Sequence, residues 1–149
     1  MRILAAGSVL TAVLVFATTA MGTAGPADAP RISSVTAARS QYGTILFDRR
    51  GFVLYAFTKD SPGRSACTGA CAKAWPPYIV TGTLAAGKGT AASRLGTVRR
   101  SDGSRQATYA GRPLYYYVGD RKPRQILCQN IDEFGGLWLV VRPNGTVVR

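Results

Sequence analysis

Two aspartates, Asp60 and Asp120, are the residues of this chain that could do acid–base or cation chemistry. Each follows an aromatic segment and precedes a turn that contains Pro or lies beside Gly. A pair of carboxylates can hold a cation or serve as general acid and base, as in glycoside hydrolysis. Alternatively, each carboxylate accepts backbone N–H groups of its own turn and fixes the strand exit. We favour this structural role and keep a carboxylate-based hydrolase as the alternative.

No histidine occurs anywhere in the 149 residues. Its absence excludes Ser-His and Cys-His nucleophile pairs, imidazole general bases and the commonest metal ligand. A thiolate metal site would have only three sulfur ligands, one fewer than a closed structural zinc site needs. The haem attachment pattern CxxCH is also missing. We therefore assign no catalytic residue and expect no metal and no cofactor, and we favour a non-enzymatic role over the carboxylate-based hydrolase.

The three cysteines are an odd number, so one thiol is left over if the oxidising conditions outside the cell form a disulfide. Cys67 and Cys71 are separated by a short loop with Gly69, close enough for a local bridge if the segment is not a regular helix. The alternative is a bridge from Cys128 to one of them. Spacing alone leaves both pairings open.

The two aspartates belong to an internal repeat. The segment 54–60 aligns with 114–120, and further on Cys67 lies opposite Cys128 and Trp75 opposite Trp138. A repeat of this size cannot bury an apolar face alone and packs against its copy. We therefore expect one pseudo-symmetric core built from both copies.

Aromatic residues two positions apart point to the same face of a strand. Tyr55 and Phe57 have this spacing in the first copy, and Tyr115 and Tyr117 have it in the second. These four rings are predicted to form the shared core.

The motifs Tyr55-x-Phe57-x-x-Asp60 and Tyr115-x-Tyr117-x-x-Asp120 resemble the Y-x-[FWY]-x-x-D repeat of a bacterial secreted family, often described as predicted lipoproteins. The surrounding Cys67-Thr-Gly-Ala-Cys71, Trp75-Pro-Pro and Phe134-Gly-Gly-Leu-Trp138 agree with it. The resemblance covers residues 42–148 and implies an envelope repeat of unknown function.

The resemblance also bears on the cysteine pairing. It favours the bridge between Cys67 and Cys71, because both belong to the segment that leads to Trp75 and form a self-contained unit. Cys128 would then be a free thiol, buried as a small apolar group.

Short β-branched and aromatic runs separated by turn residues predict a mostly β fold. Hairpins are expected over 44–57, with Asp48 and Gly51 in the turn, over 95–109, and over 138–148. The Ala-rich segment 68–75 predicts a short helical turn after the first motif, and 81–92 is predicted to be a flexible loop. The fold class is thus two pseudo-symmetric hairpin-containing repeats packed as one small domain.

The predicted domain organisation begins with a signal peptide over residues 1–24. Arg2 precedes an apolar stretch, residues 3–16, that is shorter than a membrane-spanning helix and is followed by small residues. Residues 25–40 are predicted to be a linker, and 41–149 a single domain with repeats at 41–78 and 93–148. No cysteine precedes Cys67, so we expect an exported chain without a lipid anchor or a transmembrane segment in its mature form.

The net charge of +12 favours anionic partners. For an exported chain these are envelope polymers or anionic head groups, and we expect no nucleic acid partner. The leading hypothesis is a non-enzymatic module that interacts with another envelope protein or has a structural role. The alternative is a binder of anionic envelope polymers through an Arg-rich face near aromatic residues. That face would comprise Arg99, Arg100, Arg105, Arg112, Arg121, Lys122 and Arg124, beside Tyr109 and Tyr115 to Tyr117.

Overall fold

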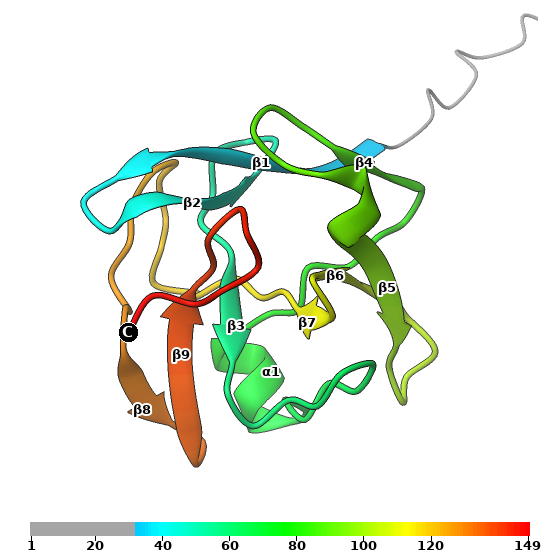
Figure 1. Ribbon diagram of the computed structural model, residues 1–149. Helices are drawn as coiled ribbons and strands as arrows, with labels where there is room; N and C mark the ends of the chain where they lie inside the picture. The colour runs from blue at the N-terminus through cyan, green and yellow to red at the C-terminus, as the bar shows by residue number, and fades with distance from the viewer. Residues whose placement is uncertain (1–31) are drawn as a thin grey trace, which may run out of the picture.

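The computed structural model describes residues 32–149, so the predicted signal peptide and the first part of the predicted linker lie outside the described residues. Nine short strands, one α-helix and one 3-10 helix make up the described chain (Figure 1). In chain order these are β1 (Ile32–Ser40), β2 (Gly43–Asp48), β3 (Tyr55–Phe57), α1 (Ala70–Ala74), β4 (Thr83–Ala86), η1 (Ala92–Arg94), β5 (Leu95–Arg99), β6 (Arg105–Tyr109), β7 (Arg112–Pro113), β8 (Ile131–Glu133) and β9 (Gly136–Val140).

The strands form three three-stranded sheets, with the orders β2-β1-β4, β3-β9-β8 and β5-β6-β7. In the view of Figure 1, β1 and β2 cross the top, β8, β9 and β3 stand on one side, and β5 to β7 stand on the other. All pairings are antiparallel except that of β1 with β4. The prediction of a mostly β domain with a short helix after the first motif is confirmed.

Corresponding hairpins recur in the two halves of the described chain. Gly43 turns the β1–β2 hairpin and Gly103 the β5–β6 hairpin, both with a φ of 82°. The next turn contains Gly51, with a φ of 88°, in the first half and Gly111, with a φ of 77°, in the second. At these positions a left-handed backbone favours glycine because it has no Cβ. As predicted, Asp48 accepts hydrogen bonds from backbone N–H groups of the turn that contains Gly51.

The two halves exchange strand pairings. In β3, Tyr55 lies opposite Val140 of β9, while Tyr115 of the second half lies opposite Pro77 of the first. Tyr55 and Tyr115 also pair with each other through two N–H···O bonds of 2.9 Å. Each motif strand therefore pairs with the chain that follows the tryptophan of the other half, so the halves interlock as one unit.

The interior has two apolar clusters, one on each face of the motif strands. Tyr55 and Phe57 point into the first, which is largely aromatic, whereas Leu54 and Ala56 point into the second. This division follows from the two-residue period of a strand. The rings predicted to form the core are buried, except Tyr117, which is half-buried at the edge of the first cluster.

The predicted linker differs from the structure at its C-terminal end, where residues 32–40 form β1. This strand pairs with β2 from Val35 to Ser40 and with the whole of β4 on its other side. The segment 81–92, predicted to be a flexible loop, likewise contains β4 and starts η1. Both segments are made of small residues because the chains approach closely: a Cβ on Gly87 would lie 2.4 Å from Cγ2 of Thr36. Backbone pairing does not need large side chains, so the apolar pattern gave no sign of these strands.

Candidate functional site at the seam between the repeats

The motif tyrosines and aspartates form two crossed pairs between the halves. The hydroxyl of Tyr55 donates to Oδ2 of Asp120 at 2.7 Å, and that of Tyr115 donates to Oδ2 of Asp60 at 2.8 Å. The tyrosine of each copy thus holds the aspartate of the other. The sequence does not reveal these pairings, because each hydrogen bond joins a tyrosine of one copy to the aspartate of the other copy.

The second oxygen of each carboxylate accepts a backbone N–H from the loop that follows it. Oδ1 of Asp60 accepts the N–H of Ala66 at 2.7 Å, and Oδ1 of Asp120 accepts that of Leu127 at 3.0 Å. These bonded residues directly precede the cysteines of the two copies. Each aspartate therefore fixes the end of a longer loop, and not the immediate turn that the sequence predicted. Within residues 32–149, no group of three or more acidic, Cys or His side chains is placed to hold a metal ion.

The environment of the two aspartates is suited to a structural role. Burial raises the pKa of Asp60 and of Asp120, while the N–H and hydroxyl groups that stabilise each carboxylate partly oppose the rise. Burial is also the largest cause of the raised pKa values of Tyr55 and Tyr115, which therefore remain protonated donors near neutral pH.

The pKa directions predict how stability depends on pH. A carboxyl group with a raised folded pKa binds more protons in the folded than in the unfolded chain, so stability rises as pH falls toward the unfolded pKa of about 3.9. The pKa of Asp102 is shifted in the opposite direction, because hydrogen bonds from Ser104 lower it. The stability that this ionised carboxylate contributes is therefore lost as the pH falls. Urea midpoints of the wild type at pH 7 and pH 4 measure the sum of all groups, and variants isolate each one.

Replacing Asp60 or Asp120 by Asn should therefore make the change in stability between about pH 7 and pH 4 less favourable than in the wild type. The matched control, Asp102→Asn, should make that change more favourable. If the Asp60 and Asp102 variants shift the pH dependence in the same direction, the assigned signs are wrong.

A stack of four aromatic rings lies beside the crossed pairs and alternates between the copies. Phe57 stacks on Trp138 at 4.2 Å, Trp138 on Trp75 at 4.0 Å, and Tyr117 covers Trp75 at 4.7 Å between centroids. Glu133 accepts both indole N–H groups: its carboxylate accepts that of Trp75 at 2.7 Å, and its backbone carbonyl accepts that of Trp138 at 3.2 Å. The stack joins the two halves through apolar area that neither half provides alone.

The structure pairs Cys67 with Cys71 in a disulfide, the pairing that the resemblance favoured, with a Cα–Cα distance of 5.3 Å. Both cysteines are buried in the aromatic cluster. Cys128 is a free thiol that packs half-buried against the same cluster. Burial raises the pKa of Cys128, which keeps it in the less reactive thiol form.

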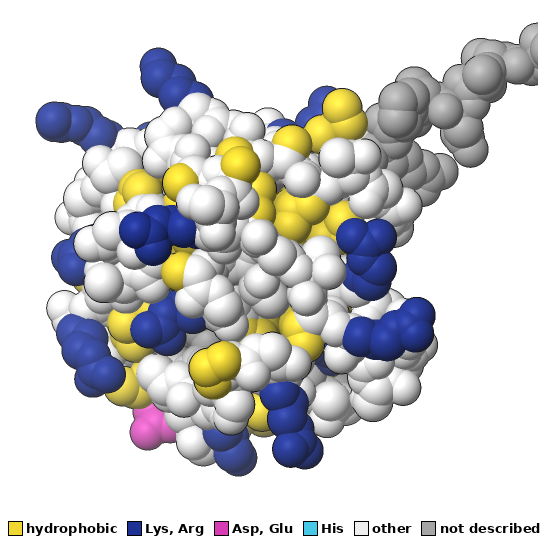
Figure 2. Space-filling view, turned by 45° about the vertical axis from the view of Figure 1, so that its right-hand side comes forward, with side chains coloured by type: hydrophobic (Ala, Val, Ile, Leu, Met, Phe, Trp, Pro, Cys, Tyr) yellow, Lys and Arg dark blue, Asp and Glu magenta, His cyan; other side chains and the backbone are white. Residues whose placement is uncertain are grey.

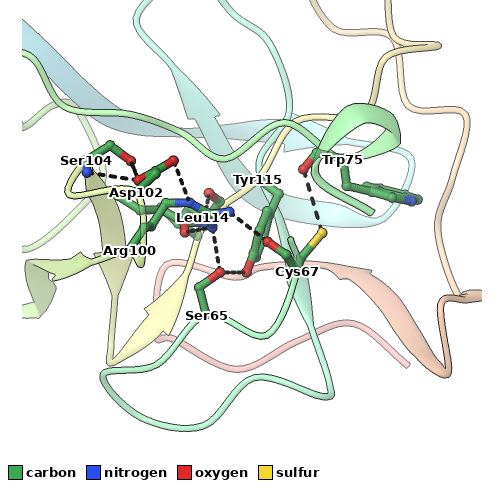
Figure 3. A network of polar contacts seen from close by, with 9 residues as sticks. Ser65, Cys67, Trp75, Arg100, Asp102, Ser104, Leu114 and Tyr115 are labelled. Atoms are coloured by element: carbon green, nitrogen blue, oxygen red, sulfur yellow. Dashed lines mark hydrogen bonds and ion pairs between the residues drawn. The ribbon is translucent and has the colours of Figure 1, made fainter. Parts of the chain in front are cut away.

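A relay of hydrogen bonds runs from a buried arginine across the seam to Asp60. Figure 3 shows its part from Arg100 through Ser65 to Tyr115. Nη1 of Arg100 donates to Oγ of Ser65 at 2.6 Å, and Ser65 lies 2.7 Å from the hydroxyl of Tyr115. Because Tyr115 gives its proton to Asp60, Ser65 must donate to Tyr115. All donors point one way, so the relay connects the positive charge of Arg100 to the negative charge of Asp60.

Arg100 is only 9% exposed and is held by further hydrogen bonds. Nη1 also donates to Oε1 of Gln106 at 2.8 Å, and Nη2 donates to the carbonyl of Cys67 at 2.7 Å. Its Nε is buried without a hydrogen-bond partner, and the nearest carboxylate oxygen, on Asp102, is 4.0 Å away. The sequence contains no sign of this role, since Arg100 is one arginine within a basic string and Ser65 has no motif.

A basic groove of about 590 Å³ opens above this relay. One wall is the loop after β3, and the other is the turn between β5 and β6, so the groove lies at the seam between the repeats. We call it the seam groove. Its lining consists of Lys59, Ser61, Arg64, Ser65, Ala66, Thr68, Arg99, Arg100 and Ser101.

The predicted Arg-rich face is not a single surface with interleaved rings. Tyr109 and Tyr115 are fully buried, so those rings belong to the core. Arg99 and Arg100 line the seam groove, whereas Arg105 lines a different hollow. Arg124 lies 4.6 Å over the ring of Phe47 in another part of the surface. The string separates because its residues alternate between strands and turns.

The crossed motifs and the repeated hairpins agree with the comparison to known families. Residues 36–78 and 96–142 each match the secreted repeat of unknown function. The chain belongs to this family. The two matched segments of the secreted repeat are the two interlocked halves of the structure, and the family is described as secreted.

Neither the curated proteins nor the solved structures include a match to this secreted repeat chain. Within the part of the chain that the structure describes, no helix is long and apolar enough to cross a membrane.

Proposed function

We propose that this secreted repeat protein is a non-enzymatic module that binds an anionic polymer of the cell envelope. The support is the way in which the fold uses its carboxylates. Every acidic side chain of residues 32–149 except Asp132 accepts a hydrogen bond from the protein: Asp48, Asp60, Asp102, Asp120 and Glu133. Most carboxylates are thus hydrogen-bonded within the fold, whereas most Lys and Arg side chains are exposed to solvent.

The described chain holds few ion pairs that would neutralise its basic residues. Within residues 32–149, nitrogen–oxygen distances of 4.0 Å or less occur only between Arg50 and Asp48 and between Arg100 and Asp102. Figure 2 shows Lys and Arg side chains spread over the visible face, with an acidic side chain at its lower edge. Such a surface attracts polyanions through many weak contacts.

The polymer proposal predicts strongly salt-dependent binding. Beads bearing a glycerol phosphate polymer should retain the full mature chain at low salt, and its affinity should fall at least about tenfold between about 50 and 200 mM NaCl because counterions are released. Neutral dextran beads are the control and should retain nothing. Equal retention on dextran, or retention that is insensitive to salt, would contradict the proposal.

A further inference from the structure

Resting on the proposed function, we infer that the seam groove is the specific contact of this protein for a phosphate group of the polymer. The groove combines cations and hydroxyl groups from both repeats in one hollow. No carboxylate belongs to its lining, although Asp60 lies under one wall and Asp102 near the other. A phosphodiester group offers one negative charge and acceptor oxygens that suit such a lining.

The walls of the groove are fixed before any ligand arrives. Asp60 holds the N–H of Ala66, and Arg100 holds the hydroxyl of Ser65 and the carbonyl of Cys67. The disulfide closes the loop just beyond, at Cys71. A preorganised wall loses less conformational entropy when a ligand binds. This favours binding at a specific site over non-specific attraction to the charged surface.

The charge of Arg100 is partly balanced by Asp60 through the relay, but the charges at the rim are not balanced. Lys59, Arg64 and Arg99 are exposed and form no ion pair within residues 32–149. Nζ of Lys59 donates one long hydrogen bond, to the carbonyl of Phe134 at 3.4 Å. These three cations therefore remain available to an anion in the groove, and the guanidinium groups match phosphate oxygens in a bidentate geometry.

The β5–β6 hairpin supplies a second reason for an anion here. Arg99 lies directly opposite Arg105 in the antiparallel register. Like charges in opposed positions destabilise a strand pair. A phosphate beside Arg99 would relieve this repulsion, which no carboxylate of the described chain does by an ion pair.

The lining favours a polymer phosphate over a lipid headgroup. Ala66 is the only apolar residue of the groove, and the rest are cationic or hydroxyl-bearing. A membrane-binding surface places large apolar side chains beside its basic residues, so that they enter the interface. The groove has no such residue.

The test titrates the full mature chain with inorganic phosphate and with glycerol phosphate polymer at fixed salt, following amide chemical shifts. The groove variant is Arg64→Gln with Arg99→Gln. Its matched control is Arg121→Gln with Arg142→Gln, which removes the same charge from exposed positions outside the groove. Thermal unfolding of both variants checks that they fold.

Phosphate should shift the amides of residues 61–68 and 99–101 in the wild type. The groove variant should bind both probes at least about tenfold more weakly, while the control variant should change affinity by less than about threefold. Equal weakening by the two variants would overturn the seam groove as a site and leave the proposed polymer binding intact. If the polymer binds neither the wild type nor the control, the proposed function fails, whatever phosphate does.

Anionic phosphatidylglycerol vesicles form the last arm of the test. The expected result is that the groove variant and its control bind vesicles alike, since a headgroup is not the ligand. If instead the groove variant loses vesicle binding and retains the polymer, the phosphate source is a membrane and the inference is wrong.

Discussion

Residues 93–149 produced alone will show no cooperative thermal transition. This segment contains the whole second repeat, yet one of the two strand partners of β9 is β3, which the fragment lacks. It also loses Asp60, the acceptor of Tyr115, and Trp75, the stacking partner of Trp138. A piece of this size buries too little apolar surface to fold without such contacts. Circular dichroism during heating and one-dimensional NMR measure the outcome.

The complementary fragment, residues 32–92, is predicted to be unfolded for the same reason. Mixing the two fragments should restore a folded complex, because every pairing between the halves can form again without a covalent link. The matched control is a mixture in which the second fragment carries Trp138→Ala, which should fail to assemble. A sharp transition for residues 93–149 alone would show that the exchanged strand is dispensable.

The architecture followed from the sequence where a pattern was both local and repeated. The turn of Asp48 and Gly51 and the hairpin at Gly103 were predicted from residue types that these backbone conformations require. The repeat of Tyr, aromatic residue, Asp, Cys and Trp predicted a shared core because two copies of one unit bury the same face. Strands β1 and β4 were missed because their small residues have no apolar period.

The site was predictable only in part, because its contacts form between residues of different copies and depend on how the two copies pack. The motif identified Tyr55, Asp60, Tyr115 and Asp120 as important, but not that each tyrosine would bond the aspartate of the other copy. The burial of Arg100 depends on a polar pocket that forms only when the two repeats meet. A basic residue in a run of basic residues is ordinarily solvated, so the sequence indicated a surface role for it.

Replacing Trp138 by Ala is expected to destabilise the domain by about 3 to 5 kcal/mol, the usual cost of removing a large aromatic side chain from a packed core. Trp138 is fully buried, is stacked between Phe57 and Trp75, and meets the edge of Tyr115. Because a domain of this kind is stable by about 5 to 15 kcal/mol, the variant should lose a large part of its stability. Urea unfolding followed by circular dichroism measures the change.

The control for this prediction is Leu127→Ala, which removes an apolar side chain that is 57% exposed and should change stability by no more than about 0.5 kcal/mol. Trp75→Ala should cost about as much as Trp138→Ala, since the two indoles occupy equivalent places in the stack. The double variant should lose less stability than the sum of the losses of the two single variants, by about 0.5 to 3 kcal/mol. The reason is that either single substitution already removes the stacking contact between the two rings. Strict additivity would mean that the 4.0 Å stack does not couple the halves and that the crossed Tyr–Asp pairs and exchanged strands hold them together without it.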